Sequence, residues 1–222
     1  DPLTGEALRD AGDAASETHL AAELARRFPD DAVLSEEAVD TERRVDAPRV
    51  WIIDPLDGTR EFAEPPRDDW AVHVALVVDG GLAAGAVALP GRRLTLDTGA
   101  PPRARPSHDG SPRLVVSRTR PTEHAQHLAR TLGAELVPMG SAGAKAMAVV
   151  LGDADVYAHS GGQYEWDSAA PVAVAAAAGL HVSRLDGSPL RYNQPDPWLP
   201  DVLICRPDLA DAVIRTCREV DS

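Results

Sequence analysis

Residues 51–59 constrain this chain more than any other segment, because they join an apolar strand to a cluster of charge. The segment reads WIIDPLDGT. Ionised carboxylates at the end of a buried run carry a heavy desolvation cost unless cations lie beside them. Pro55 fixes its own backbone dihedral and Gly58 permits a positive one, so the chain can turn sharply there. The turn directs four oxygen groups toward one point: Asp54, the Leu56 carbonyl, Asp57 and the Thr59 hydroxyl. Hard oxygen ligands of this kind suit Mg²⁺ or Mn²⁺.

The same segment has a plainer interpretation, since aspartate, proline and glycine all favour turns after a strand. Two further acidic clusters favour the interpretation as a metal site. Glu36 and Glu37 follow a short apolar run at residues 32–34, and Asp167 stands before an alanine-rich segment. Three acidic clusters, each at the boundary of a predicted element, make a better metal site than any one of them.

The first half of the chain predicts one helix and a small sheet. Apolar residues recur at helical spacing over residues 14–28, and Asp13 stands where an N-cap belongs. Residues 50–53, 70–78 and 82–89 have the composition of strands, and the last two flank a hairpin signal at Asp79.

The second half follows a segment rich in proline and glycine at residues 98–112, which we interpret as a loop or a junction between domains. Strands and helices then alternate, which predicts an α/β layer. We therefore expect an N-terminal α+β metal-binding half at residues 1–106 and a C-terminal α/β substrate-binding half at residues 107–222. The expected strands lie at 114–117, 137–139, 156–158, 181–185 and 202–205, and the expected helices at 123–132, 141–151, 168–178 and 209–220.

Composition limits the class of protein. The 222 residues suffice for one large domain or two small ones. A formal charge of −13 argues against a broad nucleic-acid interface, which needs a basic surface. The sequence has no apolar run long enough to cross a membrane and no signal-like N-terminus, so we expect a cytoplasmic protein without a membrane partner. Cys205 and Cys217 fall in predicted apolar elements and are expected to serve packing.

Three segments together resemble the signature motifs of a known family: residues 35–37 (SEE), 54–59 (DPLDGT) and 166–171 (WDSAAP). Their order and spacing are similar to those of the lithium-sensitive, magnesium-dependent phosphatases related to inositol monophosphatase. The resemblance extends from about Asp13 to the C-terminus. The flanking segments are most similar to the CysQ-type 3'(2'),5'-bisphosphate nucleotidases of actinobacteria; these are residues 58–62, 140–145, 165–167 and 185–193.

The resemblance implies a fold, which is the layered αβαβα sandwich of the inositol monophosphatase and fructose-1,6-bisphosphatase type. The family carries a long amphipathic helix before the segment that matches residues 11–13, and only residues 1–10 stand there. We therefore expect that first helix to be missing and one face of the first sheet to be exposed. A homodimer is expected on the same resemblance.

The resemblance also assigns metal ligands. Glu36, Asp54 and the Leu56 carbonyl would hold one Mg²⁺, while Asp54, Asp57 and Asp167 would hold a second. A third, weaker ion could sit near Glu36 and Glu37, although an adjacent glutamate on a loop is more often solvated. Mn²⁺ is an expected substitute and Li⁺ an expected inhibitor that displaces one ion. We interpret His73 as a buried or surface histidine, because imidazole suits zinc better than magnesium.

Three residues are the expected catalytic group: Asp13, Thr59 and Glu36. By resemblance, Thr59 and Asp13 orient and deprotonate the attacking water. A helix N-cap remains a second interpretation of Asp13, and both roles can coexist. Asp167 precedes a helix whose first turn we expect to contain Pro171, so that the helix N-terminus would face the anion.

The expected substrate contacts are Gly58, Thr59, Ser117, Arg118, Ser141, Lys145 and Asp167. Arginine grips phosphates in a bidentate manner, which favours Arg118 for a second phosphate. The resemblance implies hydrolysis of 3'-phosphoadenosine 5'-phosphate to AMP and phosphate, or of 3'-phosphoadenylyl sulfate to adenylyl sulfate, as recycling in sulfate assimilation. The alternatives are a phosphatase for inositol 1-phosphate, fructose 1,6-bisphosphate or another sugar phosphate, and an inactive nucleotide-binding regulator. The intact acidic set argues against the regulator.

Overall fold

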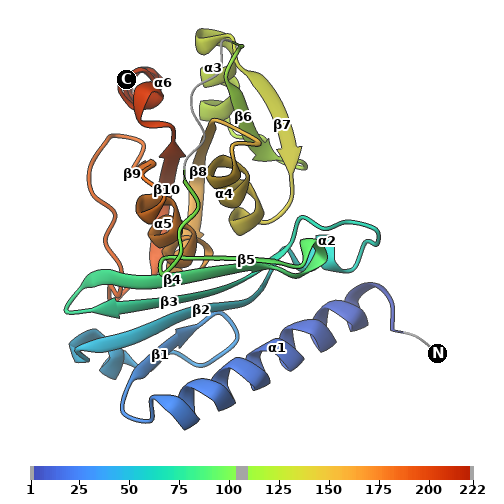
Figure 1. The fold of residues 1–222 in the computed structure, drawn as a ribbon, viewed down its shortest axis with the longest axis vertical. Coiled ribbons are helices and arrows are strands. Elements are labelled where there is room, and N and C mark those ends of the chain that lie inside the picture. Colours follow the sequence, from blue (N-terminus) through green and yellow to red (C-terminus); the bar gives the residue numbers. More distant parts are fainter. Residues whose placement is uncertain (1–2, 104–109, 221–222) are drawn as a thin grey trace.

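Two five-stranded sheets organise the computed structural model, which describes residues 3–103 and 110–220. Their strand orders are β1-β2-β3-β4-β5 and β7-β6-β8-β10-β9. Helix α1 covers one face of the first sheet, α4 and α5 lie between the sheets, and α3 and α6 cover the far face of the second (Figure 1). The predicted αβαβα sandwich is therefore confirmed, whereas the expectation of an exposed face on the first sheet is wrong, because α1 covers that face.

The first sheet holds the strand that carries the acidic segment. Strand β2 extends through Asp54 to Asp57, further than the predicted strand at residues 50–53, so both carboxylates belong to the end of the strand itself. The predicted strands at 70–78 and 82–89 are confirmed, while β5 was not predicted. The strands are β1 (Ala32–Ser35), β2 (Arg49–Asp57), β3 (Ala71–Val78), β4 (Gly81–Leu89) and β5 (Leu94–Asp97), with the short helices η1 (Glu42–Asp46), α2 (Thr59–Phe62) and η2 (Pro90–Arg92).

The second sheet combines parallel and antiparallel strands, because β6 runs parallel to β7 and β8 while β10 runs antiparallel to β8 and β9. Its strands are β6 (Arg113–Ser117), β7 (Glu135–Met139), β8 (Val156–Tyr164), β9 (His181–Ser183) and β10 (Trp198–Cys205). Its helices are α3 (Glu123–Leu132), α4 (Ala142–Leu151), α5 (Glu165–Ala177) and α6 (Ala210–Val220), with η3 (Pro207–Leu209). All expected strands and helices of this half are present.

Helix α5 begins at Glu165, three residues earlier than expected, so Pro171 lies inside the helix and its expected place in the first turn is wrong. A proline in the helix interior has no N–H for the carbonyl four residues earlier. That carbonyl belongs to Asp167. Glu165, Trp166 and Asp167, which stand before the alanine-rich run, form the first turn of the helix.

Helix α1 spans Gly5–Arg27 and its N-cap is Thr4, so the expectation that Asp13 caps this helix is wrong. The helix approaches β2 and α2 closely at Gly12. A Cβ on Gly12 would lie 2.6 Å from the Phe62 ring and 2.9 Å from the Leu56 side chain. The absence of a side chain at Gly12 therefore lets α1 bring Asp13 beside the acidic segment.

The larger apolar cluster lies between the two sheets and draws on both, as Ile52, Val87, Met147, Val174 and Ile204 illustrate. Cys205 and Cys217 are buried in the second cluster, beside α3 and α6, which confirms their packing role. The division at residues 106 and 107 stays a prediction, because that boundary lies outside the described residues. In the part of the chain that the structure describes, no helix has the length and apolar character needed to cross a membrane.

Because of the contact at Gly12, we expect alanine to be less stable than glycine at this position, the reverse of their usual order in a helix. Alanine is favoured over glycine in an open helix by about 1 kcal/mol. We expect Gly12→Ala instead to lower the free energy of unfolding by about 1–3 kcal/mol, because its methyl group overpacks the contact with Phe62 and Leu56. Urea denaturation measures the change. Ala14→Gly, at an exposed position of α1, is the control for propensity alone, and a stabilised Gly12→Ala would contradict the close approach.

Candidate active site

Four carboxylates from three segments meet at one end of the first sheet. Asp54 and Asp57 lie in β2, Glu36 directly follows β1, and Asp167 lies in the first turn of α5. Asp54 is 1% exposed and Asp57 is 8% exposed. Each of the four feels the charge of at least one other. The structure therefore brings together the acidic clusters that the sequence singled out, with Asp54 and Asp57 buried and both Glu36 and Glu37 exposed.

Burial and mutual repulsion make three of these groups hard to ionise. Burial, followed by the charges of Asp167 and Asp57, raises the pKa of Glu36 to about 7, although Glu36 keeps contact with solvent. Burial and the charge of Asp57 raise the pKa of Asp167 to about 6. Burial likewise holds the pKa of Asp54 well above its usual range. The folded protein therefore needs protons or cations at this place.

Asp57 behaves in the opposite way, because helix α4 points its N-terminus at it. The Ser141 Oγ donates to Asp57 Oδ2 at 2.5 Å, Gly143 N donates to Oδ2 at 2.6 Å, and Ala142 N donates to Oδ1 at 3.1 Å. Burial alone would raise the pKa of Asp57, but the imidazole of His73, 3.2 Å away, and the hydrogen bond from Ser141 outweigh burial and lower it to about 2. Free N–H groups at a helix N-terminus favour such an anion.

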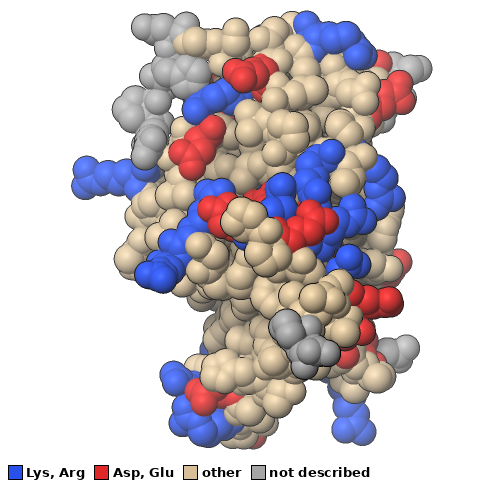
Figure 2. Space-filling view, turned by 90° about the vertical axis from the view of Figure 1, so that its right-hand side faces the viewer, with Lys and Arg blue, Asp and Glu red and all other residues tan. Residues whose placement is uncertain are grey.

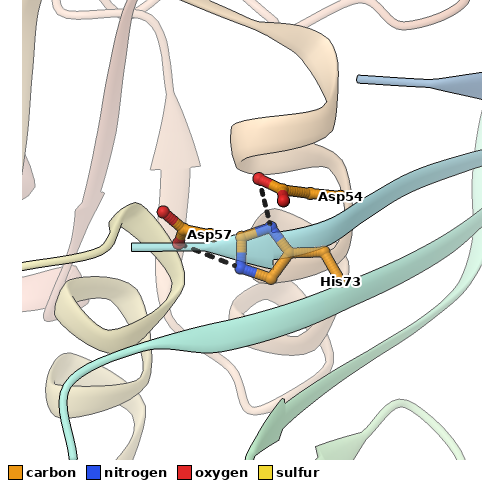
Figure 3. Close-up of side chains that lie close together, drawn as sticks. All are labelled: Asp54, Asp57 and His73. Carbon is orange, nitrogen blue, oxygen red and sulfur yellow. Dashed lines mark ion pairs between the residues drawn. The ribbon is translucent and has the colours of Figure 1, made fainter. Parts of the chain in front are cut away.

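His73 lies on β3 directly opposite Asp54 and is fully buried. Its Nε2 is 3.2 Å from Asp57 Oδ2 and its Nδ1 is 3.9 Å from Asp54 Oδ2, as Figure 3 shows. Nδ1 also lies 3.0 Å from the Trp166 carbonyl oxygen. The sequence analysis missed this contact. The available signal was the pairing of the two strands, which places His73 opposite the first aspartate.

Asp13 and Thr59 border the same region. Burial, with repulsion from Glu37 and Asp10, raises the pKa of Asp13 to about 6. Its Oδ1 is buried and has no hydrogen-bond partner among residues 3–103 and 110–220. Thr59 opens α2 after Gly58, whose φ of 86° requires the left-handed region that glycine tolerates. An orphaned acceptor of this kind calls for a donor such as a bound water.

A divalent cation fits this donor set. The carboxylates supply hard oxygen ligands from several directions, and a cation would remove the repulsion that raises their pKa values. Asp54, Asp57 and His73 also place one ligand atom each within 4.8 Å of one another. With oxygen atoms in the majority, the set suits Mg²⁺ or Mn²⁺.

A hollow of about 230 Å³ opens beside the carboxylates. Figure 2 shows Lys and Arg side chains gathered with Asp and Glu across the middle of one face of the molecule. The residues that line the hollow come from both halves of the chain: Gly58, Thr59, Arg60, Glu61, Ser117, Arg118, Thr119, Arg120, Met139, Gly140, Ser141 and Lys145. All the expected substrate contacts except Asp167 are among them.

Two of the expected substrate contacts, Lys145 and Ser141, already form hydrogen bonds within the protein. Lys145 is buried, and its Nζ donates to the carbonyls of Gly140 at 3.2 Å and Ser141 at 2.8 Å. Burial lowers the pKa of Lys145. Ser141 has a φ of 45°, a strained value for a residue with a side chain, while its hydroxyl bonds Asp57. Both residues therefore shape the wall that holds Asp57.

Arg118 reaches across the hollow to the first half of the chain. Its Nε donates to Glu61 Oε1 at 2.5 Å and its Nη2 donates to Glu64 Oε2 at 2.9 Å. Glu61 is buried, and Gly140 packs against its carboxylate so closely that a Cβ there would lie 2.2 Å away. Two carboxylates thus hold one guanidinium in place, and the sequence analysis did not foresee either partner.

Comparison with known sequences finds relatives over nearly the whole chain. The model of the inositol monophosphatase family matches residues 5–222. A 3'-phosphoadenosine 5'-phosphate phosphatase of Mycobacterium leprae is 53% identical over 226 residues, covering 96% of this chain and 83% of the relative. The 3'(2'),5'-bisphosphate nucleotidase CysQ of Escherichia coli is 32% identical, covering 85% of this chain and 81% of the relative.

Solved structures show the same fold. The structure of inositol monophosphatase II from Staphylococcus aureus superposes with a TM-score of 0.81 at 20% identity, covering 96% of this chain and 86% of that chain. An inositol monophosphatase and NADP phosphatase of dual specificity, bound to D-inositol 1-phosphate, superposes with a TM-score of 0.78 at 19% identity, covering 93% and 82%.

The raised pKa values predict how Mg²⁺ stabilises the protein at different pH. Glu36 and Asp167 favour the protonated form when folded, so the stability they confer is fully present below their usual values of 4.5 and 3.8. That stability is lost as the pH rises through about 6 to 7, where a bound cation replaces the protons. The increase in melting temperature caused by Mg²⁺ should therefore grow from about pH 5.5 to about pH 8.

Melting curves with MgCl₂ and with EDTA, at matched ionic strength, measure this dependence. Asp57 does not affect it, because its pKa of about 2 lies below the window. An increase that is constant with pH, or that is larger in acid, would contradict the assignment of Glu36 and Asp167 to the cation site.

Proposed function

Because the chain belongs to the inositol monophosphatase family, we propose that it is a magnesium-dependent phosphatase that hydrolyses 3'-phosphoadenosine 5'-phosphate to AMP and phosphate. The observation that carries the proposal is the 53% identity, over 96% of this chain, to a mycobacterial phosphatase of that name. The related 3'-phosphoadenylyl sulfate carries the same 3'-phosphate and would be a second substrate. A homodimer, inhibition by Li⁺ and a role in sulfate assimilation are further parts of the proposal.

The carboxylates define where Mg²⁺ would be held. Glu36, Asp54 and the Leu56 carbonyl would hold one ion, and Asp54, Asp57 and Asp167 a second, with Asp54 shared. When bound, the two ions neutralise the phosphoryl oxygens, lower the pKa of the attacking water and stabilise the leaving alkoxide. A third, weaker ion near Glu36 and the exposed Glu37 also belongs to the proposal.

The protein's own side chains would orient the attacking water and accept its proton. Asp13 would accept the proton of the attacking water at its unpartnered Oδ1, and Thr59 would orient that water. The raised pKa of Asp13, about 6, suits a group that takes up a proton near neutral pH. Glu36 completes the proposed catalytic group, and Gly58 and Asp167 border the reacting phosphate.

The hollow beside the carboxylates would hold the second phosphate. Arg118, with Ser117 next to it, is held by Glu61 and Glu64, but Arg60, Arg120 and Lys145 also line the hollow, so a chain of net charge −13 is locally basic there. Ser141 and Lys145 would form the wall of the same subsite. Inositol 1-phosphate lacks a second phosphate for this position, so the subsite favours the nucleotide over the first rival substrate. Fructose 1,6-bisphosphate is harder to discriminate against than inositol 1-phosphate, because it carries a second phosphate, although it is smaller than the nucleotide.

A substrate panel tests the proposal. We expect kcat/KM for 3'-phosphoadenosine 5'-phosphate to exceed those for inositol 1-phosphate and fructose 1,6-bisphosphate by at least about tenfold, the worth of one charged hydrogen bond. Asp54→Asn should abolish phosphate release from every substrate, because it removes the shared charge. Asp211→Asn, on exposed α6, is the control and should leave turnover unchanged. A preference for inositol 1-phosphate would contradict the nucleotide assignment, and an active Asp54→Asn would contradict the shared ligand.

A second variant tests the proton acceptor. Asp13→Asn keeps the shape of the side chain and should lower kcat by about two to four orders of magnitude, the range for a positioned general base. Because Asp13 lies within α1 and not at its N-cap, the variant should not weaken the helix. Glu6→Gln, at an exposed position of α1, is the control. A fully active Asp13→Asn would leave Thr59 and Glu36 as the activating pair.

A further inference from the structure

The fully buried imidazole of His73 lies close to two of the four carboxylates and to the residue that precedes a third. His73 Nε2 lies 3.2 Å from Asp57 Oδ2, and Nδ1 lies 3.0 Å from the Trp166 carbonyl oxygen and 3.9 Å from Asp54 Oδ2. Trp166 directly precedes Asp167 in the first turn of α5. Figure 3 shows the ring beside both aspartates of β2, and the contact with the Trp166 carbonyl joins it to α5.

Helix α4 closes the other side of the same ring. A Cβ on Gly143 would lie 2.0 Å from His73 Nε2, so only a glycine permits this contact. The Gly143 N–H and the Ser141 hydroxyl meet the same carboxylate oxygen, Asp57 Oδ2, at 2.6 and 2.5 Å. His73 is therefore enclosed by β2, α4 and α5 at once.

This arrangement distinguishes the two oxygens of Asp57. Oδ2 faces Gly143 N, Ser141 Oγ and His73 Nε2, which leaves it little room for another partner. Among the hydrogen bonds of the described residues, Oδ1 accepts only the Ala142 N–H, at 3.1 Å. Since a carboxylate oxygen offers about two acceptor sites, Oδ1 keeps one for a cation.

We propose that His73 is a positioning residue for the magnesium site. By holding Asp57 Oδ2 and the Trp166 carbonyl, it fixes the side chain of Asp57 and the first turn of α5, so that Asp57 Oδ1, Asp54 and Asp167 converge. The imidazole acts through the carboxylates, because Nε2 is pressed against Gly143 and Nδ1 faces a carbonyl. The inference rests on the proposed function in one respect, which is that these carboxylates bind Mg²⁺.

Two substitutions separate the two contacts of the ring. Glutamine places an amide near the position of Nε2 and can still donate to Asp57, whereas asparagine reaches only the position of Nδ1 and keeps the contact with Trp166. Calorimetric titration of the substrate-free protein with Mg²⁺ measures the affinity directly. We expect His73→Asn to weaken Mg²⁺ binding by roughly 10- to 100-fold, the usual cost of losing a group that orients a ligand.

The Mg²⁺ affinity of His73→Gln should stay within about threefold of that of the parent protein, a smaller change than the 10- to 100-fold loss expected for His73→Asn. Saturating Mg²⁺ should restore kcat of His73→Asn with an unchanged KM for the nucleotide. His159→Asn is the matched control, because His159 lies in the second sheet and its Nε2 meets the Gly162 carbonyl at 3.1 Å. Melting curves in EDTA show whether each variant folds. If His73→Asn does not fold, Gly143→Ala displaces the imidazole from the other side and should weaken Mg²⁺ binding in the same way.

Equal Mg²⁺ affinities in His73→Asn and His73→Gln, whether normal or weakened, would overturn the inference, because the bond to Asp57 would not be the cause. The parent protein separates this failure from that of the proposed function. If the parent binds Mg²⁺ and releases phosphate while both variants bind normally, only the role of His73 fails. If the parent does not bind Mg²⁺, the metal site itself fails and the inference falls with it.

Discussion

Repulsion among enclosed carboxylates is the constraint on which this structure depends. Glu36, Asp54 and Asp167 all have pKa values raised by burial and by their neighbours' charges. Ionised groups in such an environment need cations or protons. The apolar strand β2 and the helices around it hold the carboxylates together in spite of this cost, which is the reason that we propose a site for divalent cations here.

Asp57 connects this constraint to the second half of the chain. Helix α4 directs its first N–H groups at Asp57, with Ser141 held at a φ of 45° so that its hydroxyl can join them. The same loop borders the hollow beside Arg118. The proposed metal ligand and the proposed substrate subsite therefore share one segment, so a shift of α4 relative to the first sheet would disturb both.

Sequence reasoning recovered what depends on local pattern. The hairpin of β3 and β4, the α/β layer of the second half and the meeting of the acidic clusters follow from strand patterns, turn residues and motif spacing, while the layered sandwich was expected from the family resemblance. The predicted helix boundaries at Asp13 and Pro171 were wrong. Aspartate and proline often mark the start of a helix, but in this chain both residues lie inside helices, where they serve the candidate active site or the packing. His73 and Glu61 were missed since their partners, Asp57 and Arg118, become neighbours only through tertiary contacts. No local pattern encodes such contacts.

The most direct test of the account is a crystal structure with Mn²⁺ and AMP, in which anomalous scattering locates the ions. We expect two ions that share Asp54, one of them reached by Asp57 through Oδ1 while Oδ2 keeps its hydrogen bonds from Ser141 and Gly143 and its contact with His73. An ion bound through Asp57 Oδ2, or ions that do not contact Asp54, would contradict the central claim that this enclosed carboxylate cluster is the magnesium site.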